Sequence, residues 1–213
     1  KDPDLVILGG DIIDSAMYAS IEYVEESLNS LEIPWIYSMG NHDFEYGTEY
    51  FSETAYNTYL PRLDSISQAA DGYQVYDAGD FQILAVDDSN NQVTAEALEA
   101  LLTLQAQGDP IVVVSHVPIQ PLDNEELILL SKQVWGEDAN GNATVLLGYK
   151  SCIPNEITTE FINSACGEES NVCLILSGHI HFYHKDVLGP QTTQVITGAG
   201  FEGEAVHITL TPQ

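Results

Sequence analysis

Four short runs of apolar residues divide the chain and constrain its fold more than any other feature. They cover residues 5–8, 35–39, 111–114 and 173–176. A continuous apolar run of this length is typical of a strand that is covered on both faces. The segments between the runs carry apolar residues at helical spacing, as in residues 94–106. This alternation predicts an α/β fold in which two sheets pack face to face with helices outside.

Two expected helices have identifiable ends. The first, residues 16–31, would be capped by Asp14 or Ser15, because such side chains accept hydrogen bonds from the unpaired amides of a first turn. The second, residues 48–59, would be bounded by Pro61, since proline lacks the amide that continues a helix.

The later part of the chain is rich in expected strands. Residues 73–76 and 81–86 flank a turn that contains Gly79, which predicts a hairpin. The final strands are expected over residues 183–187, 193–196 and 205–210. Without an internal repeat or linker, residues 1–213 are expected to form a single domain. The sequence starts without methionine, directly before a core strand, and we interpret this start as processed or shortened.

The charge of the chain is strongly negative and excludes some classes of partner. Thirty-three Asp and Glu against five Lys and Arg give a formal net charge of −28. Nucleic-acid binding through Lys and Arg is excluded, because phosphate contacts depend on cations, and docking on anionic lipid is disfavoured. No apolar run reaches the roughly 18 residues of a membrane span. The low Lys and Arg content resembles that of some secreted bacterial proteins, which favours a secreted or cell-envelope location over a cytoplasmic one.

The three cysteines lack the C-x-x-C spacing of a zinc knuckle. Cys166 and Cys173 bracket a short turn and could form a disulfide. The alternative, which we favour, is that both remain buried thiols together with Cys152.

Potential metal ligands follow all four apolar runs. In chain order they are Asp11; Asn41, His42 and Asp43; His116; and His179 and His181. Four of the six histidines therefore stand at strand ends, where α/β sheets bind ligands. Imidazole, carboxylate and amide oxygen together suit divalent transition metals. Two such ions about 3.5–4 Å apart can activate water and promote a displacement at phosphorus.

Each of these segments also has an ordinary structural interpretation when it is taken alone. Gly-Asn-His-Asp is often only a turn, because Gly and Asn tolerate positive φ. A histidine such as His116, after a strand and a serine, is usually a core or loop residue. All four segments in this order rarely arise by chance, so the set predicts a metal centre.

The same segments resemble those of the calcineurin-like metallophosphoesterases. That family carries D-x-H, G-D-x-x-D, G-N-H-[DE], a lone His and G-H-x-H in chain order. Residues 10–14, 40–43, 115–116 and 178–181 match four of the five. The resemblance covers most of the chain and implies a β-sandwich of two mixed sheets flanked by helices, with the first strand missing here.

The resemblance also implies a role for each candidate residue. His42 would hydrogen-bond the phosphate and assist the leaving group, and Asp43 would orient His42. The ions would be Mn, Fe, Zn or Ni. Their ligands would be Asp11, which bridges both ions, then Asn41, His116 and His179 on the second ion, and His181 on the first.

The D-x-H segment is absent from this sequence. In the family it lies on the strand before the one that begins here at Asp4. The first ion would keep only Asp11 and His181, so we expect one tightly bound ion or none, against two in the complete family site. A neighbouring strand edge would also be unpaired, which favours self-association.

These observations predict a metal-dependent phosphomonoesterase or phosphodiesterase that uses a hydroxide held between the metals. Its substrate would be a phosphoester small molecule or a phosphorylated macromolecule. Because two ligands are missing, the alternatives are an inactive chain or a mononuclear metal-binding module. For His184 we favour a structural role, and His207 is expected at the surface or in the core.

Overall fold

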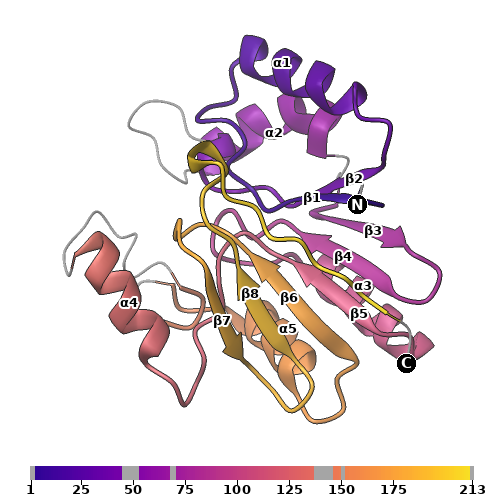
Figure 1. The fold of residues 1–213 in the computed structure, drawn as a ribbon, viewed down its shortest axis with the longest axis vertical. Coiled ribbons are helices and arrows are strands. Elements are labelled where there is room, and N and C mark those ends of the chain that lie inside the picture. The colour runs from indigo at the N-terminus through magenta and orange to yellow at the C-terminus, as the bar shows by residue number, and fades with distance from the viewer. Residues whose placement is uncertain (1–2, 45–52, 68–70, 137–145, 150–151, 212–213) are drawn as a thin grey trace.

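Two sheets form the centre of the molecule, and helices cover them on both sides (Figure 1). The computed structural model describes residues 3–44, 53–67, 71–136, 146–149 and 152–211. In the smaller sheet, β1 (Val6–Leu8) pairs in parallel with β2 (Trp35–Tyr37). The expected class, α/β with two sheets flanked by helices, is confirmed.

The larger sheet is mixed, with the order β3-β4-β5-β6-β8-β7. Its strands are β3 (Tyr73–Asp77), β4 (Gln82–Val86), β5 (Ile111–Val114), β6 (Val172–Ser177), β7 (His184–Val187) and β8 (Thr193–Ile196). The pairs β3–β4 and β7–β8 are antiparallel, and the remaining pairs are parallel. The expected hairpin over β3 and β4 is therefore present, with Gly79 at a positive φ in its turn.

Most of the helices lie on the outer faces of the two sheets, and the fourth stands beside the edge formed by β7 (Figure 1). They are α1 (Tyr18–Asn29), α2 (Glu53–Ser67), α3 (Ala95–Gln107), α4 (Glu126–Trp135) and α5 (Glu156–Cys166), and the short 3-10 turns are η1 (His42–Phe44) and η3 (Gly200–Glu202). The first two helices pack on the smaller sheet, and α3 and α5 pack on the larger one. Among the described residues, no helix combines the length and the apolar character that a membrane crossing requires.

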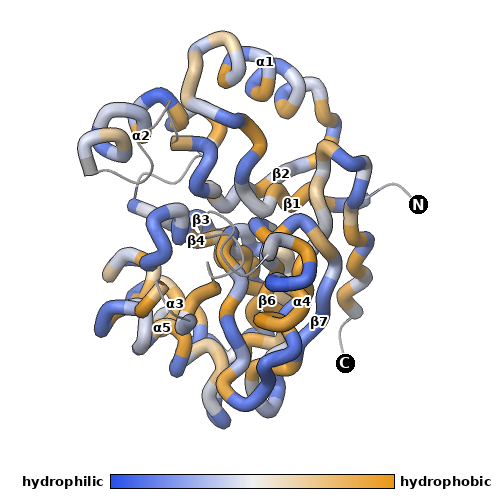
Figure 2. The backbone as a smooth tube through the Cα atoms, turned by 90° about the vertical axis from the view of Figure 1, so that its left-hand side faces the viewer, coloured by the Kyte–Doolittle hydropathy of each residue, from blue (hydrophilic) through white to orange (hydrophobic). Residues whose placement is uncertain are grey.

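Apolar side chains from both sheets meet in an inner layer. Ile7 and Ile36 come from the smaller sheet, and Ile83 and Val112 are among their partners from the larger one. The next residue of β4, Leu84, points to the opposite face and packs with α3 and α5. Both faces of the central strands are thus buried, which explains why their sequences are continuously apolar. In Figure 2 apolar residues, drawn in orange, run along central strands such as β4 and β6.

Two expectations about helix ends were wrong. Helix α1 begins after Met17, without a side-chain cap, because the carboxylate of Asp14 pairs with His42 instead. Pro61 lies inside α2. The helix continues past it because Leu63 and Ile66 are fully buried, and their packing outweighs the hydrogen bond that proline cannot donate. Residues 48–52 of this expected helix lie outside the described residues.

The last expected strand was also wrong. Residues 205–210 form no strand, and most of them are exposed. Alternation of apolar residues makes a strand only where a partner strand supplies the hydrogen bonds. The segment instead runs beside the larger sheet (Figure 1), and Ile208 packs partly against the inner layer.

Cys166 and Cys173 are free thiols, so the disulfide that the sequence left open is not formed. Cys152 is buried and the other two are partly buried. Burial raises the pKa of the Cys166 thiol to about 11, which keeps it protonated at neutral pH.

Candidate metal centre

The loops that follow β1, β2, β5 and β6 meet at one place. The amide of Gly178 donates to the carbonyl oxygen of His116 (3.1 Å), which joins the loops after β6 and β5. Gly10 and Gly40 lie in the loops after β1 and β2. A Cβ on Gly10 would lie 2.3 Å from Nδ1 of His116, and one on Gly40 would lie 2.2 Å from Oδ1 of Asp11. Only glycine permits an approach this close.

Four potential ligand atoms surround a single point where these loops meet. Nε2 of His116 lies 3.1 Å from Oδ2 of Asp11, 3.1 Å from Oδ1 of Asn41 and 3.1 Å from Nδ1 of His179. The ligand atoms of Asp11, His116 and His179 all lie within 4.8 Å of one another. Tetrahedral bonds of about 2.0–2.1 Å to an ion separate neighbouring ligand atoms by roughly 3.3 Å. The observed spacing therefore fits one transition-metal ion.

The chemistry of these atoms also fits a cation. The oxygens of Asp11 and Asn41 accept hydrogen bonds. Any hydrogen bond within the cluster must therefore be donated by Nε2 of His116 or Nδ1 of His179. His116 is oriented for this position because its Nδ1–H donates to the carbonyl oxygen of Gly9 (2.7 Å). Nε2 of His179 is buried and has no hydrogen-bond partner among the described residues. A bound cation would instead be held by the oxygens of Asp11 and Asn41, by Nε2 of His116 and by Nδ1 of His179.

The charges of the cluster are strongly coupled. Burial raises the pKa of the Asp11 carboxyl, but the neighbouring His116 and His179 hold it well below its usual range. Burial likewise lowers the pKa of His116, yet the adjacent Asp11 carboxylate outweighs it and raises the value to about 9. Burial and the charge of His116 lower the pKa of His179 to about 3. The positive charge of the cluster thus lies on His116, beside the carboxylate of Asp11, and His179 is neutral.

His181 lies next to this cluster but is not one of its four members. Its ring makes edge contacts with Trp135, at 5.1 Å between ring centroids, and with Phe201, at 5.3 Å. Burial lowers the pKa of His181, and the charge of Asp11 partly opposes this effect. Asp11, His179 and His181 all adopt positive φ, at 53°, 67° and 61°. This left-handed backbone turns their side chains out of the strand direction.

The expectation that Asp43 orients His42 was wrong. Asp43 is buried in η1 and accepts hydrogen bonds from the amides of Asp11 (3.0 Å), Ile13 (3.2 Å) and Gly40 (2.7 Å), as well as from the hydroxyl of Tyr37. A 3-10 turn points successive side chains in different directions, so Asp43 faces inward while His42 faces outward. Asp43 therefore holds the loops after β1 and β2 together.

Asp14 takes the orienting role. Its Oδ1 lies 3.0 Å from Nδ1 of His42, and the amide of His42 donates to Oδ1 of Asp11 (2.8 Å). The His42 side chain is 36% exposed, and the carboxylate of Asp14 is almost fully exposed. His42 is thus tied to the cluster through its backbone while its ring stays accessible.

The sequence interpretation missed the buried Asp88 and the hydrogen bond from the hydroxyl of Tyr37 to Asp43. Asp88 follows β4 and accepts hydrogen bonds from the amides of His116 (2.7 Å) and Val117 (3.0 Å). Its burial raises its pKa to about 7. A signal for it existed, because Asp88 also follows an apolar run, but that run had been assigned only to a hairpin. Tyr37 gives no such signal, since its hydroxyl finds Asp43 only in the folded chain.

The two remaining histidines lie away from the four-atom cluster. Nε2 of His184 lies 3.0 Å from Oδ1 of the buried Asp186, which supports a structural role. His207 is exposed.

Replacing Gly10 with alanine is expected to weaken both the fold and the centre. Gly10 has φ of +92°, and its added Cβ would strike His116. The left-handed backbone alone costs a non-glycine residue about 1–3 kcal/mol, and the collision adds to that cost. Gly79→Ala is the matched control, because Gly79 has φ of +86° but nothing within 4 Å. Urea unfolding should show a larger loss for Gly10→Ala, and only this variant should weaken metal binding. Equal losses of unfolding free energy in the two variants would show that a Cβ at Gly10 does not collide with His116.

Comparisons with known proteins identify the family and the fold of the chain. The family model described as calcineurin-like phosphoesterase matches residues 1–183. No relative is found among the curated proteins. A crystal structure of a dimetal phosphatase from Danio rerio is similar in fold, with a TM-score of 0.53 and 13% identity, over 92% of this chain and 72% of that one. The chain belongs to the calcineurin-like phosphoesterase family, whose members are metal-dependent hydrolases of phosphoesters.

Proposed function

We propose that this chain hydrolyses phosphoric esters at the centre formed by Asp11, Asn41, His116 and His179. The observation that carries the proposal is the spacing of 3.1 Å between Nε2 of His116 and each of the other three ligand atoms. Membership in the phosphoesterase family supports the reaction class. Substrates in this class are phosphoester small molecules or phosphorylated macromolecules.

The four residues would hold a divalent ion such as Mn, Fe, Zn or Ni, and His181 would contribute to a second position. When bound, such ions supply positive charge to the phosphoryl oxygens and lower the pKa of water. The protein provides the positions: Gly9 orients His116, Asp88 fixes the backbone of His116, and Asp43 fixes that of Asp11. The chain itself is strongly acidic, so attraction of an anionic phosphate is local to the ions.

His42 is the group that we assign to the leaving oxygen. Its Nδ1 pairs with Asp14. We assign to Nε2 the hydrogen bond to the phosphate and the donation of a proton as the ester bond breaks.

His42→Ala is expected to slow turnover while leaving metal affinity nearly unchanged. Loss of a general acid typically costs about 10²–10⁴-fold in rate, whereas the ligand atoms of the ion remain. Asp14→Asn should cost less, because the ring stays in place without its charge partner. Steady-state kinetics and calorimetric metal titration test both variants. Full activity of His42→Ala at unchanged metal content would remove His42 from the mechanism.

The described residues contain a single cluster of metal-ligating carboxylate and imidazole groups. We therefore expect one tight equivalent of Mn²⁺ or Zn²⁺ per chain. If the ion binds only the folded state, a free ion concentration of a hundred times Kd should raise the free energy of unfolding by about 2.7 kcal/mol. Removal by a chelator should reverse this increase and abolish hydrolysis. One tight equivalent without any hydrolysis of an aryl phosphate would favour the mononuclear binding module. Two tight equivalents with substantial turnover would show that other residues complete a second position.

A further inference from the structure

We propose that the leaving group of the substrate carries a planar aromatic ring without further negative charge, and that this ring stacks on Phe201 at the rim of the metal centre. This inference rests on the proposed function and adds the class of substrate. The observation behind it is that Phe201 is largely exposed although it lies in a hydrogen-bonded turn.

Phe201 is 80% exposed although it belongs to an ordered turn. The amide of Glu202 donates to the carbonyl oxygen of Ala199 (3.0 Å), and that of Gly203 donates to Gly200 (2.9 Å). Gly203 closes the turn at a φ of +81°. A large apolar side chain gains stability when it leaves water, and this turn keeps the ring in water. An aromatic ring held in this way is a ready binding surface.

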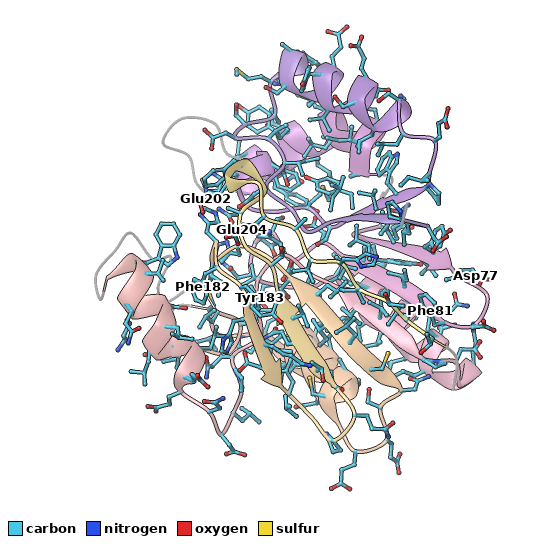
Figure 3. The ribbon with its side chains drawn as sticks, viewed as in Figure 1. Asp77, Phe81, Phe182, Tyr183, Glu202 and Glu204 are labelled. Carbon is cyan, nitrogen blue, oxygen red and sulfur yellow. The ribbon has the colours of Figure 1, made fainter. Side chains whose placement is uncertain are left out.

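The turn places Phe201 beside the candidate ligands. It follows β8 and brings the ring to 5.3 Å from that of His181, at an interplanar angle of 85°. Trp135, at the end of α4, contacts the same imidazole, and its Nε1–H donates to the carbonyl oxygen of Ile180 (2.9 Å). Phe201 and Trp135 therefore form an aromatic rim around His181. Figure 3 shows Glu202, the next residue of the turn, above Phe182 and Tyr183, which directly precede β7.

The charge near this rim selects against a leaving group that carries further negative charge. The chain has a net charge of −28, and Glu202 directly follows Phe201. Its one arginine, Arg62, is engaged elsewhere, 4.7 Å above the ring of Tyr18 and 4.8 Å above that of Tyr59. A leaving group with further phosphates would be repelled. A neutral ring would instead stack on Phe201 while the phosphoryl group lies at the ions.

Binding of two non-hydrolysable probes tests the proposal directly. Phenylphosphonate and cyclohexylphosphonate have rings of similar size, but only the first is planar and aromatic. Their affinities are measured by calorimetry on the Mn²⁺-loaded chain, so the different reactivities of aryl and alkyl esters do not enter. The wild-type chain should bind phenylphosphonate more tightly. Phe201→Leu should weaken its binding by about threefold to tenfold, the size of a stacking contact, and Phe201→Tyr should retain it.

Tyr23→Leu is the matched control, because Tyr23 is 73% exposed on α1 and lies outside the aromatic rim. It should leave both affinities unchanged. A hydrolysis arm compares phenyl phosphate with a phosphotyrosine peptide, since both are phenolic esters. Phe201→Leu should raise KM for whichever of these two esters the wild-type chain hydrolyses with the lower KM. It should change kcat much less.

The outcomes separate this inference from the proposed function. Binding of both phosphonates with equal affinity, or equal weakening of both in Phe201→Leu, would overturn the aromatic rim and leave the phosphoesterase proposal standing. A chain that binds neither phosphonate and hydrolyses no ester would overturn the proposed function and this inference with it. Preference for a polyphosphorylated leaving group would also contradict the rim.

Discussion

Replacing His116 with alanine is expected to lower the affinity of the chain for Mn²⁺ or Zn²⁺ by more than about a hundredfold, since loss of a residue that only orients a ligand already costs about 10–100-fold. Nε2 of His116 is the atom from which the other three ligand atoms each lie 3.1 Å away. Hydrolysis should fall with the metal. Calorimetric titration after dialysis against a chelator measures the affinity, and circular dichroism shows whether the variant folds.

His207→Ala is the control for this experiment. His207 is exposed and lies outside the cluster, so its loss should change neither affinity nor hydrolysis. If His116→Ala folds and binds the ion as tightly as His207→Ala does, the assignment of the four ligands is wrong.

The second large effect is expected on stability, from Asp43→Ala. This substitution leaves three backbone amides and the hydroxyl of Tyr37 without their acceptor. Each unsatisfied buried donor costs about 1–3 kcal/mol, so a loss of at least about 3 kcal/mol is expected, from a total that is typically about 5–15 kcal/mol. Burial raises the pKa of Asp43 to about 6, so urea unfolding is measured at pH 8, where the carboxylate is ionised.

Tyr37→Phe provides the comparison, because it removes one donor and leaves the three backbone amides bound to Asp43. Its cost should be about 1 kcal/mol, the net value of a single hydrogen bond. Similar losses in the two variants would show that Asp43 does not hold the loops after β1 and β2 together.

The central strands and the cluster could be predicted because they follow from one rule. A strand buried on both faces is continuously apolar, and the polar residues directly after it lie at the carboxyl end of the sheet. This rule applies to Asp11, His116 and His179 without knowledge of their neighbours. It applies equally to Asp88, which was missed because β4 was considered only as part of a hairpin.

Side-chain partners that depend on the exact path of a loop could not be predicted. The sequence places Asp43 beside His42, but η1 turns the two side chains apart and Asp14 becomes the partner of the imidazole. Residues 205–210 alternate like a strand, and only the fold shows that no partner strand is beside them. The contact of Phe201 with His181 likewise joins loops that are unrelated in sequence.

The positive φ values of Asp11, His179 and His181 have a consequence for protein engineering. Each non-glycine residue in this conformation costs about 1–3 kcal/mol, which glycine would recover. A laboratory selection for heat resistance alone would therefore favour glycine at a position such as His181. At Asp11 the pairing with the buried His116 and the hydrogen bond from the amide of His42 oppose that change. Libraries built to stabilise this chain should keep these three codons fixed.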